Sequence, residues 1–165
     1  MTTFADLYGR YAQDVFRFAY YLSGNRDLAD DIAAETFARA LTASVDIRPG
    51  GVKAYLLAIA RNLFLDSVRM RSRTTALAEG HFDTVDPGAS PEVIAAGRLD
   101  LEATREAMLR LPERERAALL MAAVEGLPYE QIAAALGCSI SAVKVRIHRA
   151  RLHLRQLMAY RSASS

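Results

Sequence analysis

The chain is poor in the residues that indicate a disulfide framework, a metal site or a membrane anchor. It has one cysteine, Cys138, three histidines and no tryptophan, and the histidines do not stand at metal-ligand spacing. No stretch approaches the roughly 18 uninterrupted apolar residues of a membrane span. The first six residues also lack the basic start and apolar run of a secretory signal. These absences predict a cytoplasmic protein with no internal disulfide, no metal site and no membrane insertion.

Sequence motifs for catalysis are equally scarce. The chain contains no phosphate-cradling glycine loop, no nucleophile elbow and no histidine paired with an acid at ligand spacing. We therefore expect no enzyme activity, no cofactor and no small-molecule substrate. The abundant residues are alanine and leucine, which favour helix in nearly every window, so the predicted fold class is all-α.

Charged residues are abundant but segregated along the chain. The formal net charge is only +2. Residues 53–73 carry five basic side chains against one acid, and residues 139–165 carry six basic side chains and no acid. Between them, residues 74–97 carry four acids and no lysine or arginine. Two basic stretches divided by an acidic segment predict two separate contacts with nucleic acid.

The first part of the sequence predicts three helices in one small domain, residues 1–73. Apolar side chains recur at three- and four-residue steps over Phe4–Leu22, and Ser23-Gly24-Asn25 should end that helix. A second helix should follow. Proline and paired glycines in residues 46–51 predict a loop, after which a third helix should run from Val52 to about Met70.

The remainder predicts a flexible linker and a second small helical domain. Residues 74–90 contain two glycines, a proline and scattered acids without helical periodicity, which is typical of a tether. In the second domain, residues 91–165, Ser90-Pro91-Glu92 resembles a helix start, and that helix should run to about Arg110. Another helix should follow over Pro112–Glu125.

The C-terminal part of the second domain predicts a helix-turn-helix. Pro128–Leu136 is typical of a short helix, Gly137 suits a left-handed turn, and Ser139 can cap the helix that follows. At about 100° per residue, the second of these helices has a narrow apolar stripe that should pack inward. The stripe contains Val143, Ile147, Ala150, Leu154 and Leu157.

The opposite side of this second helix is basic and polar. At about 100° per residue, one set of residues points away from the core. Three arginines lie beside this set, within reach of a phosphate backbone. A solvated basic surface is the alternative, but such a surface does not require the glycine and serine at the turn. We therefore predict a face for the DNA major groove. The outward set is Ser141, Lys144, Val145, His148 and Arg149, and the flanking arginines are Arg146, Arg151 and Arg155.

Three motifs in order resemble the extracytoplasmic-function group of bacterial sigma factors, which keep the second and fourth sigma regions. Asp31–Ala40 is similar to the polymerase-binding helix of that family, and Ala54–Leu63 is similar to the helix that follows its promoter-melting loop. Leu111-Pro112, Gly126–Ala133 and Val143–Arg151 resemble its fourth region. The resemblance implies a factor that binds core RNA polymerase and promoter DNA, directs DNA opening and transcription initiation, and has an anti-sigma factor as a further partner.

The resemblance also implies roles for the residues of the first domain. Asp31 and Glu35 stand four apart on one helix face, which the resemblance assigns to the polymerase clamp; a plain exposed acidic face is the alternative. Arg61 and Asn62 are expected at the single-stranded downstream promoter element, although Asn62 could equally be a packing contact. Three further arginines end a helix without nearby acids and predict phosphate contacts: Arg69, Arg71 and Arg73.

Several positions depart from the family pattern and keep other functions open. Ala34 stands where the family usually has glutamine, and Ala142 and Val145 stand where it commonly has small hydroxyl residues. One alternative function is a helix-turn-helix repressor or activator whose N-terminal helices dimerise or sense a ligand. A second is a sigma mimic that sequesters an anti-sigma factor without reaching DNA. Cys138, in the predicted turn, is interpreted as a small packing residue rather than a redox switch.

Overall fold

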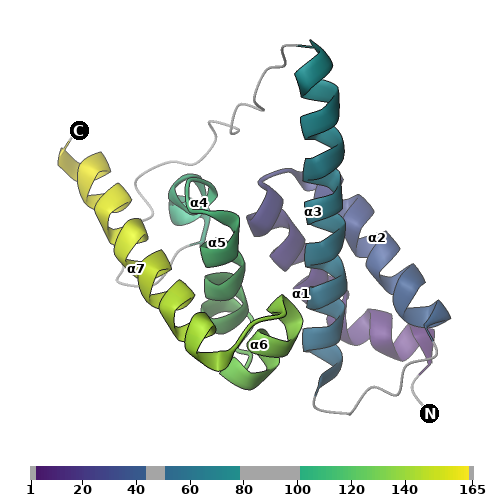
Figure 1. Ribbon diagram of the computed structural model, residues 1–165. Helices are drawn as coiled ribbons and strands as arrows, with labels where there is room; N and C mark the ends of the chain where they lie inside the picture. Colours follow the sequence, from purple (N-terminus) through teal and green to yellow (C-terminus); the bar gives the residue numbers. More distant parts are fainter. Residues whose placement is uncertain (1–2, 44–50, 79–100, 164–165) are drawn as a thin grey trace.

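The computed structural model describes residues 3–43, 51–78 and 101–163, and every regular element within them is helical. This confirms the all-α prediction. Two groups of helices follow one another along the chain (Figure 1). The first contains α1 (Phe4–Ser23), α2 (Arg26–Thr42) and α3 (Val52–Ala78). The second contains α4 (Leu101–Leu109), α5 (Glu113–Leu119), the π-helical turn η3 (Leu120–Val124), α6 (Tyr129–Leu136) and α7 (Ile140–Ala163).

The junction between α1 and α2 follows the local sequence as predicted. Gly24 takes the left-handed conformation, with φ of 70°, and its N–H donates to the carbonyl of Tyr20. Asn25 caps α2, because its side-chain oxygen accepts a hydrogen bond of 3.0 Å from the backbone N–H of Leu28. The α1, α2 and α3 helices then pack around a buried apolar core to which Val15, Phe18, Leu22, Leu56 and Leu57 contribute. Complete burial of one such side chain stabilises the fold by about 1.5–3 kcal/mol.

The α3 helix is longer than predicted. It continues to Ala78 instead of ending near Met70, so the predicted boundary after residue 73 falls inside a helix. The prediction of a linker from residue 74 rested on the glycines, the proline and the lack of helical periodicity in residues 74–90, but the first of these helix-breaking residues comes only after Ala78. Neither proline nor glycine occurs between Val52 and Ala78, and Gly80 is the next residue of either kind. Most of the predicted linker, and the predicted helix start at Ser90-Pro91-Glu92, lie outside the described residues.

The predicted helix over Pro112–Glu125 is present but changes type along its length. It begins as α5 and widens into η3, where the N–H of Glu125 donates to the carbonyl of Leu120 over 3.0 Å. A π turn of this kind inserts one additional residue into the helix. The residues that follow are therefore rotated about the helix axis relative to their positions in a regular α-helix. Glu125, at the end of the turn, is thereby directed toward the first group of helices.

The two groups of helices pack directly against each other. The α1 helix contacts α4, α5 and η3, and α3 contacts α6. In Figure 1, α7 lies on the side of the second group that faces away from α3. Buried side chains of both groups form one apolar cluster. Over the described ranges, no helix combines the length and apolar character needed to cross a membrane.

Candidate nucleic-acid and polymerase interfaces

The helix-turn-helix is formed by α6 and α7, as the sequence predicts. Gly137 takes the left-handed conformation, with φ of 67°, and the next N–H, of Cys138, donates to the carbonyl of Ala133 over 3.0 Å. Ser139 Oγ accepts a hydrogen bond of 3.0 Å from the backbone N–H of Ala142 and so caps α7. Both ends of the turn are therefore satisfied by hydrogen bonds within the motif itself.

The α7 helix has the two faces that its periodicity predicts. Val143, Ile147, Ala150 and Leu154 are buried against α5 and α6. The predicted DNA-facing residues Ser141, Lys144, His148, Arg149 and Arg151 are exposed. Two apolar side chains, Val145 and Leu152, stand among them and are 46% and 41% exposed. The result is a basic surface with two exposed apolar side chains among its charged residues.

Arg146 differs from the other basic residues of α7. Its side chain is half-buried, and its Nη1 atom is buried with no hydrogen-bond partner among the described residues. A buried guanidinium nitrogen without a partner is energetically costly. Of the arginines predicted to contact the DNA phosphate backbone from this helix, Arg146 therefore has the least freedom to reach a phosphate.

The second basic surface lies on α3. Arg69, Arg71 and Arg73 are exposed, and Arg69 is 3.7 Å from the carboxylate of Asp66. Asn62 is also exposed, which contradicts the alternative that it is a buried packing residue. The long α3 helix thus presents a basic segment near its C-terminal end, on a different element from the basic face of α7.

Arg61 occupies an environment that the sequence does not reveal. Its side chain is only 10% exposed, and its guanidinium donates to both carboxylate oxygens of Glu113, at 2.5 and 3.0 Å. Such a two-pronged contact is the geometry in which arginine also binds phosphate. In this arrangement of the chain, the predicted DNA-contacting guanidinium is already occupied by a carboxylate from α5.

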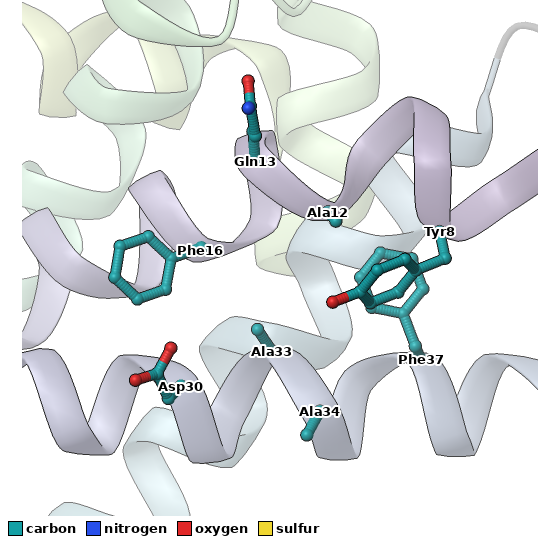
Figure 2. A pocket seen from close by; sticks show the side chains of 8 residues that line it. All are labelled: Tyr8, Ala12, Gln13, Phe16, Asp30, Ala33, Ala34 and Phe37. Atoms are coloured by element: carbon teal, nitrogen blue, oxygen red, sulfur yellow. The ribbon is translucent and has the colours of Figure 1, made fainter.

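The acidic face of α2 contains Asp31 and Glu35, and both are exposed. Glu35 forms an ion pair of 3.2 Å with Arg39, and both side chains are about half exposed, so this pair contributes little to stability. Ala34, on the same face, lines a groove between α1 and α2 (Figure 2). The groove has a volume of about 360 Å³ and is lined by Tyr8, Ala12, Gln13, Phe16, Asp30, Ala33, Ala34 and Phe37.

Two further clusters of charged side chains join the two groups of helices, and neither was predicted from the sequence. In the first, Arg17 donates to both oxygens of Glu125 at 3.0 and 2.8 Å, and Lys53 lies 3.2 Å from the same carboxylate. The Glu125 side chain is completely buried. The hydrogen bond with Glu125 raises the pKa of Arg17 above its ordinary value, against the opposing effect of partial burial.

The second cluster contains two buried arginines that bind backbone carbonyls. Arg105 donates to the carbonyl of Gly24 over 2.8 Å, and its guanidinium lies 4.8 Å from the ring centre of Tyr20. Arg116 donates to the carbonyl of Leu22 over 3.0 Å. Burial lowers the pKa of Arg116, opposed by the nearby carboxylate of Glu113, but arginine stays cationic in proteins.

No group of three or more histidine, cysteine, aspartate or glutamate side chains is arranged for a metal among the residues that the structure describes. Cys138 is half-buried in the turn before α7 and packs against the apolar core, consistent with its interpretation as a packing residue.

Comparison with known proteins identifies both groups of helices. The family model "Sigma-70 region 2" matches residues 7–74, and "Sigma-70, region 4" matches residues 101–154. We refer to α1–α3 as region 2 and to α4–α7 as region 4. These matches correspond to the two helical groups in the fold.

Individual relatives agree with these matches. The chain is 38% identical to the ECF RNA polymerase sigma factor SigE of Mycolicibacterium smegmatis, over 100% of the chain and 65% of SigE. It is 37% identical to the ECF RNA polymerase sigma factor EcfG of Rhodopseudomonas palustris, over 86% of the chain and 77% of EcfG. The solved sigma factor RpoE of Bartonella quintana, in complex with the anti-sigma factor NepR, is 30% identical with a TM-score of 0.78, covering 92% of this chain and 94% of RpoE. The chain belongs to the extracytoplasmic-function sigma factors of the sigma-70 family, non-enzymatic RNA polymerase subunits that initiate transcription.

Proposed function

We propose that this sigma factor reads a promoter through two separate surfaces, the α7 face of region 4 and the basic part of α3 in region 2. The exposed basic face of a capped recognition helix, with its opposite face buried, is the observation that carries this proposal. An α-helix fits the DNA major groove, where each base pair presents a distinct pattern of donors and acceptors.

The α7 surface is proposed to bind the upstream promoter element. Lys144, His148 and Arg149 project from the exposed side and are the candidates for base contacts, while Ser141 and Arg151 add polar and phosphate contacts. Arg146 is retained as a phosphate contact, although its half-buried side chain must shift to reach one. Because Ala142 and Val145 offer no side-chain hydrogen bond, base preference at the positions they face depends on apolar contact.

The α3 surface is proposed to bind the downstream element during opening. Arg69, Arg71 and Arg73 would neutralise phosphates, a contribution that does not depend on sequence and weakens with salt. Arg61 and Asn62 would contact the separated strand. The exposure of Asn62 and the three arginines supports this role, and Arg61 is available for it only when its bond to Glu113 is broken.

The acidic face of α2 is proposed to bind the clamp of core RNA polymerase. Asp31 and Glu35 are exposed on this face, and Ala34, also exposed, lines the adjoining α1–α2 groove. A glutamine side chain at position 34 would extend from the groove wall, whereas alanine leaves the groove open. We therefore expect the contact to combine ion pairs at the two acids with an apolar side chain of the clamp in the groove.

The location and regulation of the protein follow from the same role. Core polymerase and promoter DNA are cytoplasmic in bacteria, so we place the working protein in the cytoplasm. An anti-sigma factor is proposed as a further partner, because the solved relative RpoE was crystallised with the anti-sigma factor NepR.

The experiment that tests the proposed function is reconstituted initiation. Purified chain, core polymerase and a library of genomic promoter fragments are combined, and the transcripts are sequenced. Discrete start sites that require the chain are expected. A helix-turn-helix regulator or an anti-sigma-binding mimic cannot replace sigma, so absence of chain-dependent transcripts would contradict the proposal.

A further inference from the structure

The side of α7 that points directly away from the core is apolar. The buried residues Ile147, Ala150 and Leu154 lie on one face of the helix. At about 100° per residue, Val145 and Leu152 project within about 20° of the direction opposite that face. Their exposed fractions, 46% and 41%, agree with this outward position.

Basic side chains stand on both sides of this apolar line. Around the helix, Lys144 lies on one side of Val145 and Arg149 on the other, and both are exposed. Positive charge on both sides attracts this face to duplex DNA, where phosphates line both edges of the groove. In a helix seated in the major groove, the outermost side chains come closest to the base edges. On α7, these outermost side chains are apolar.

Val145 and Leu152 differ in their distance from the start of α7. The helix begins at Ile140, directly after the cap that Ser139 forms with the backbone N–H of Ala142. At about 3.6 residues per turn, Val145 falls within the first two turns and Leu152 in the fourth, about 10 Å farther along the axis. In a helix-turn-helix, the N-terminal residues of the second helix contact the base edges. Val145 is therefore placed to contact a base, and Leu152 lies beyond the reading segment.

The side chain of Val145 can recognise only an apolar feature of a base. It has two methyl groups and no hydrogen-bonding atom, and its branched Cβ restricts it to few rotamers, so little entropy is lost on contact. In the major groove, the C5-methyl group of thymine is the apolar feature among the base edges. A polar base edge that faces Val145 loses water without gaining a partner, which is unfavourable. 5-Methylcytosine presents the same methyl group at the same ring position.

We propose that Val145 is a specificity-determining residue that reads the C5-methyl group of a pyrimidine in the upstream promoter element. This inference rests on the proposed function, because it takes α7 as the recognition helix. At one position of the element, thymine is bound more tightly than uracil, and 5-methylcytosine more tightly than cytosine. The chain therefore distinguishes a promoter whose cytosine is methylated at that position from the same promoter without the methyl group.

The test uses holoenzyme reconstituted from the full chain and core RNA polymerase. The upstream element is first obtained by selecting bound duplexes from a random library. In synthetic copies of that element, each thymine is then replaced by uracil, and each cytosine by 5-methylcytosine, one position at a time. Competition against a labelled duplex, followed by fluorescence anisotropy, measures the relative Kd of each copy. Each comparison differs by a single methyl group and leaves base pairing intact.

One position of the element is expected to respond to the methyl group. Replacement of thymine by uracil there should weaken binding about fourfold, which is the effect of burying one methyl-sized group. With a C·G pair at the same position, 5-methylcytosine should bind about fourfold more tightly than cytosine. Equal Kd values for the methylated and unmethylated base at every position would overturn the proposal.

Three variants test whether the methyl effect belongs to Val145. Val145→Ser removes both methyl groups and should reduce the ratio of uracil Kd to thymine Kd at that position to about one. Val145→Ile keeps a branched apolar side chain and should retain the ratio. Leu152→Ser, the matched control, makes the same change from an apolar to a hydroxyl side chain in a similarly exposed residue on the same side of α7, and it should also retain the ratio. Because each ratio compares two duplexes with one protein, a general loss of affinity or of helix stability cancels.

The outcomes distinguish this inference from the proposed function. Loss of the ratio in Val145→Ser alone supports the assignment. A ratio that survives in Val145→Ser, or that is lost in Leu152→Ser, overturns it, because the methyl contact then lies elsewhere on α7. Selection of no upstream element by the holoenzyme contradicts the proposed role of α7 itself, and the methyl reading with it.

Discussion

Arg116→Met provides a quantitative test of how region 4 is anchored to region 2. The Arg116 guanidinium donates to the carbonyl of Leu22 in region 2 over 3.0 Å and to that of Leu111 in region 4 over 2.7 Å. A longer contact of 3.4 Å reaches the carbonyl of Leu109, and the guanidinium lies 6.0 Å from the ring centre of Phe64. Methionine keeps an unbranched apolar chain at this position but can donate to none of these carbonyls.

The cost of this substitution follows from the two short hydrogen bonds. Each buried carbonyl left without a donor costs about 1–3 kcal/mol. Methionine avoids the desolvation of a buried guanidinium, which offsets part of that loss. We expect the free energy of unfolding to fall by about 2–4 kcal/mol. For a chain of this size, that corresponds to a decrease in Tm of about 5–15 °C.

Urea denaturation followed by circular dichroism at 25 °C measures the effect. Arg114→Met is the matched control, because Arg114 is an exposed arginine on the same helix and its replacement should change stability by at most about 0.5 kcal/mol. Arg116→Lys keeps the charge but loses the planar fork, and it should also be destabilising. If Arg116→Met is as stable as Arg114→Met, the carbonyl contacts do not anchor region 4 and the reasoning is refuted.

Two further predictions concern the proposed binding surfaces. Asp31→Lys combined with Glu35→Lys should weaken binding to core polymerase at least tenfold, or about 1.4 kcal/mol, in a core-binding titration, with no loss of helical signal in circular dichroism. Asp66→Lys is the control. Unchanged affinity of the double variant would rule out this face as the polymerase contact. Arg149→Ala should cost about 1–3 kcal/mol and relax preference at one base pair, whereas Arg151→Ala should weaken all sequences alike and lower the salt slope by about one. A panel of single-base promoter changes at several salt concentrations measures both, and a uniform effect of Arg149→Ala would transfer base reading to another residue of α7.

Local chemistry made the helix ends and the recognition helix predictable from the sequence. Gly24 and Gly137 adopt the left-handed conformation where the pattern placed a helix end, and Ser139 caps α7 as expected. The stripe of Val143 and Ile147 is buried because helical periodicity puts it on one face. Each of these features depends on residues within a few positions of one another, so a single sequence contains the necessary information.

Only the tertiary structure decided which charged residues bind one another. Glu113 is 52 residues from Arg61, and Glu125 is 108 residues from Arg17. In the sequence, Arg17, Glu113 and Glu125 resemble ordinary solvated charges, and Arg61 was expected to contact DNA rather than a carboxylate. No period or motif relates positions so far apart, because their contact depends on how the two groups of helices pack against each other. The π turn at Leu120–Val124 contributes to this docking, and its apolar sequence is equally compatible with a regular α-helix.

The sequence by itself therefore determined the helices, the helix-turn-helix and the family, since each follows from local propensity, spacing or motif. The packing of region 4 on region 2 determined that Arg61 is paired with Glu113 and that Glu125 is buried between Arg17 and Lys53. The physical reason is that an ion pair across an interface exists only when both surfaces meet in one geometry, and that geometry is a property of the whole fold.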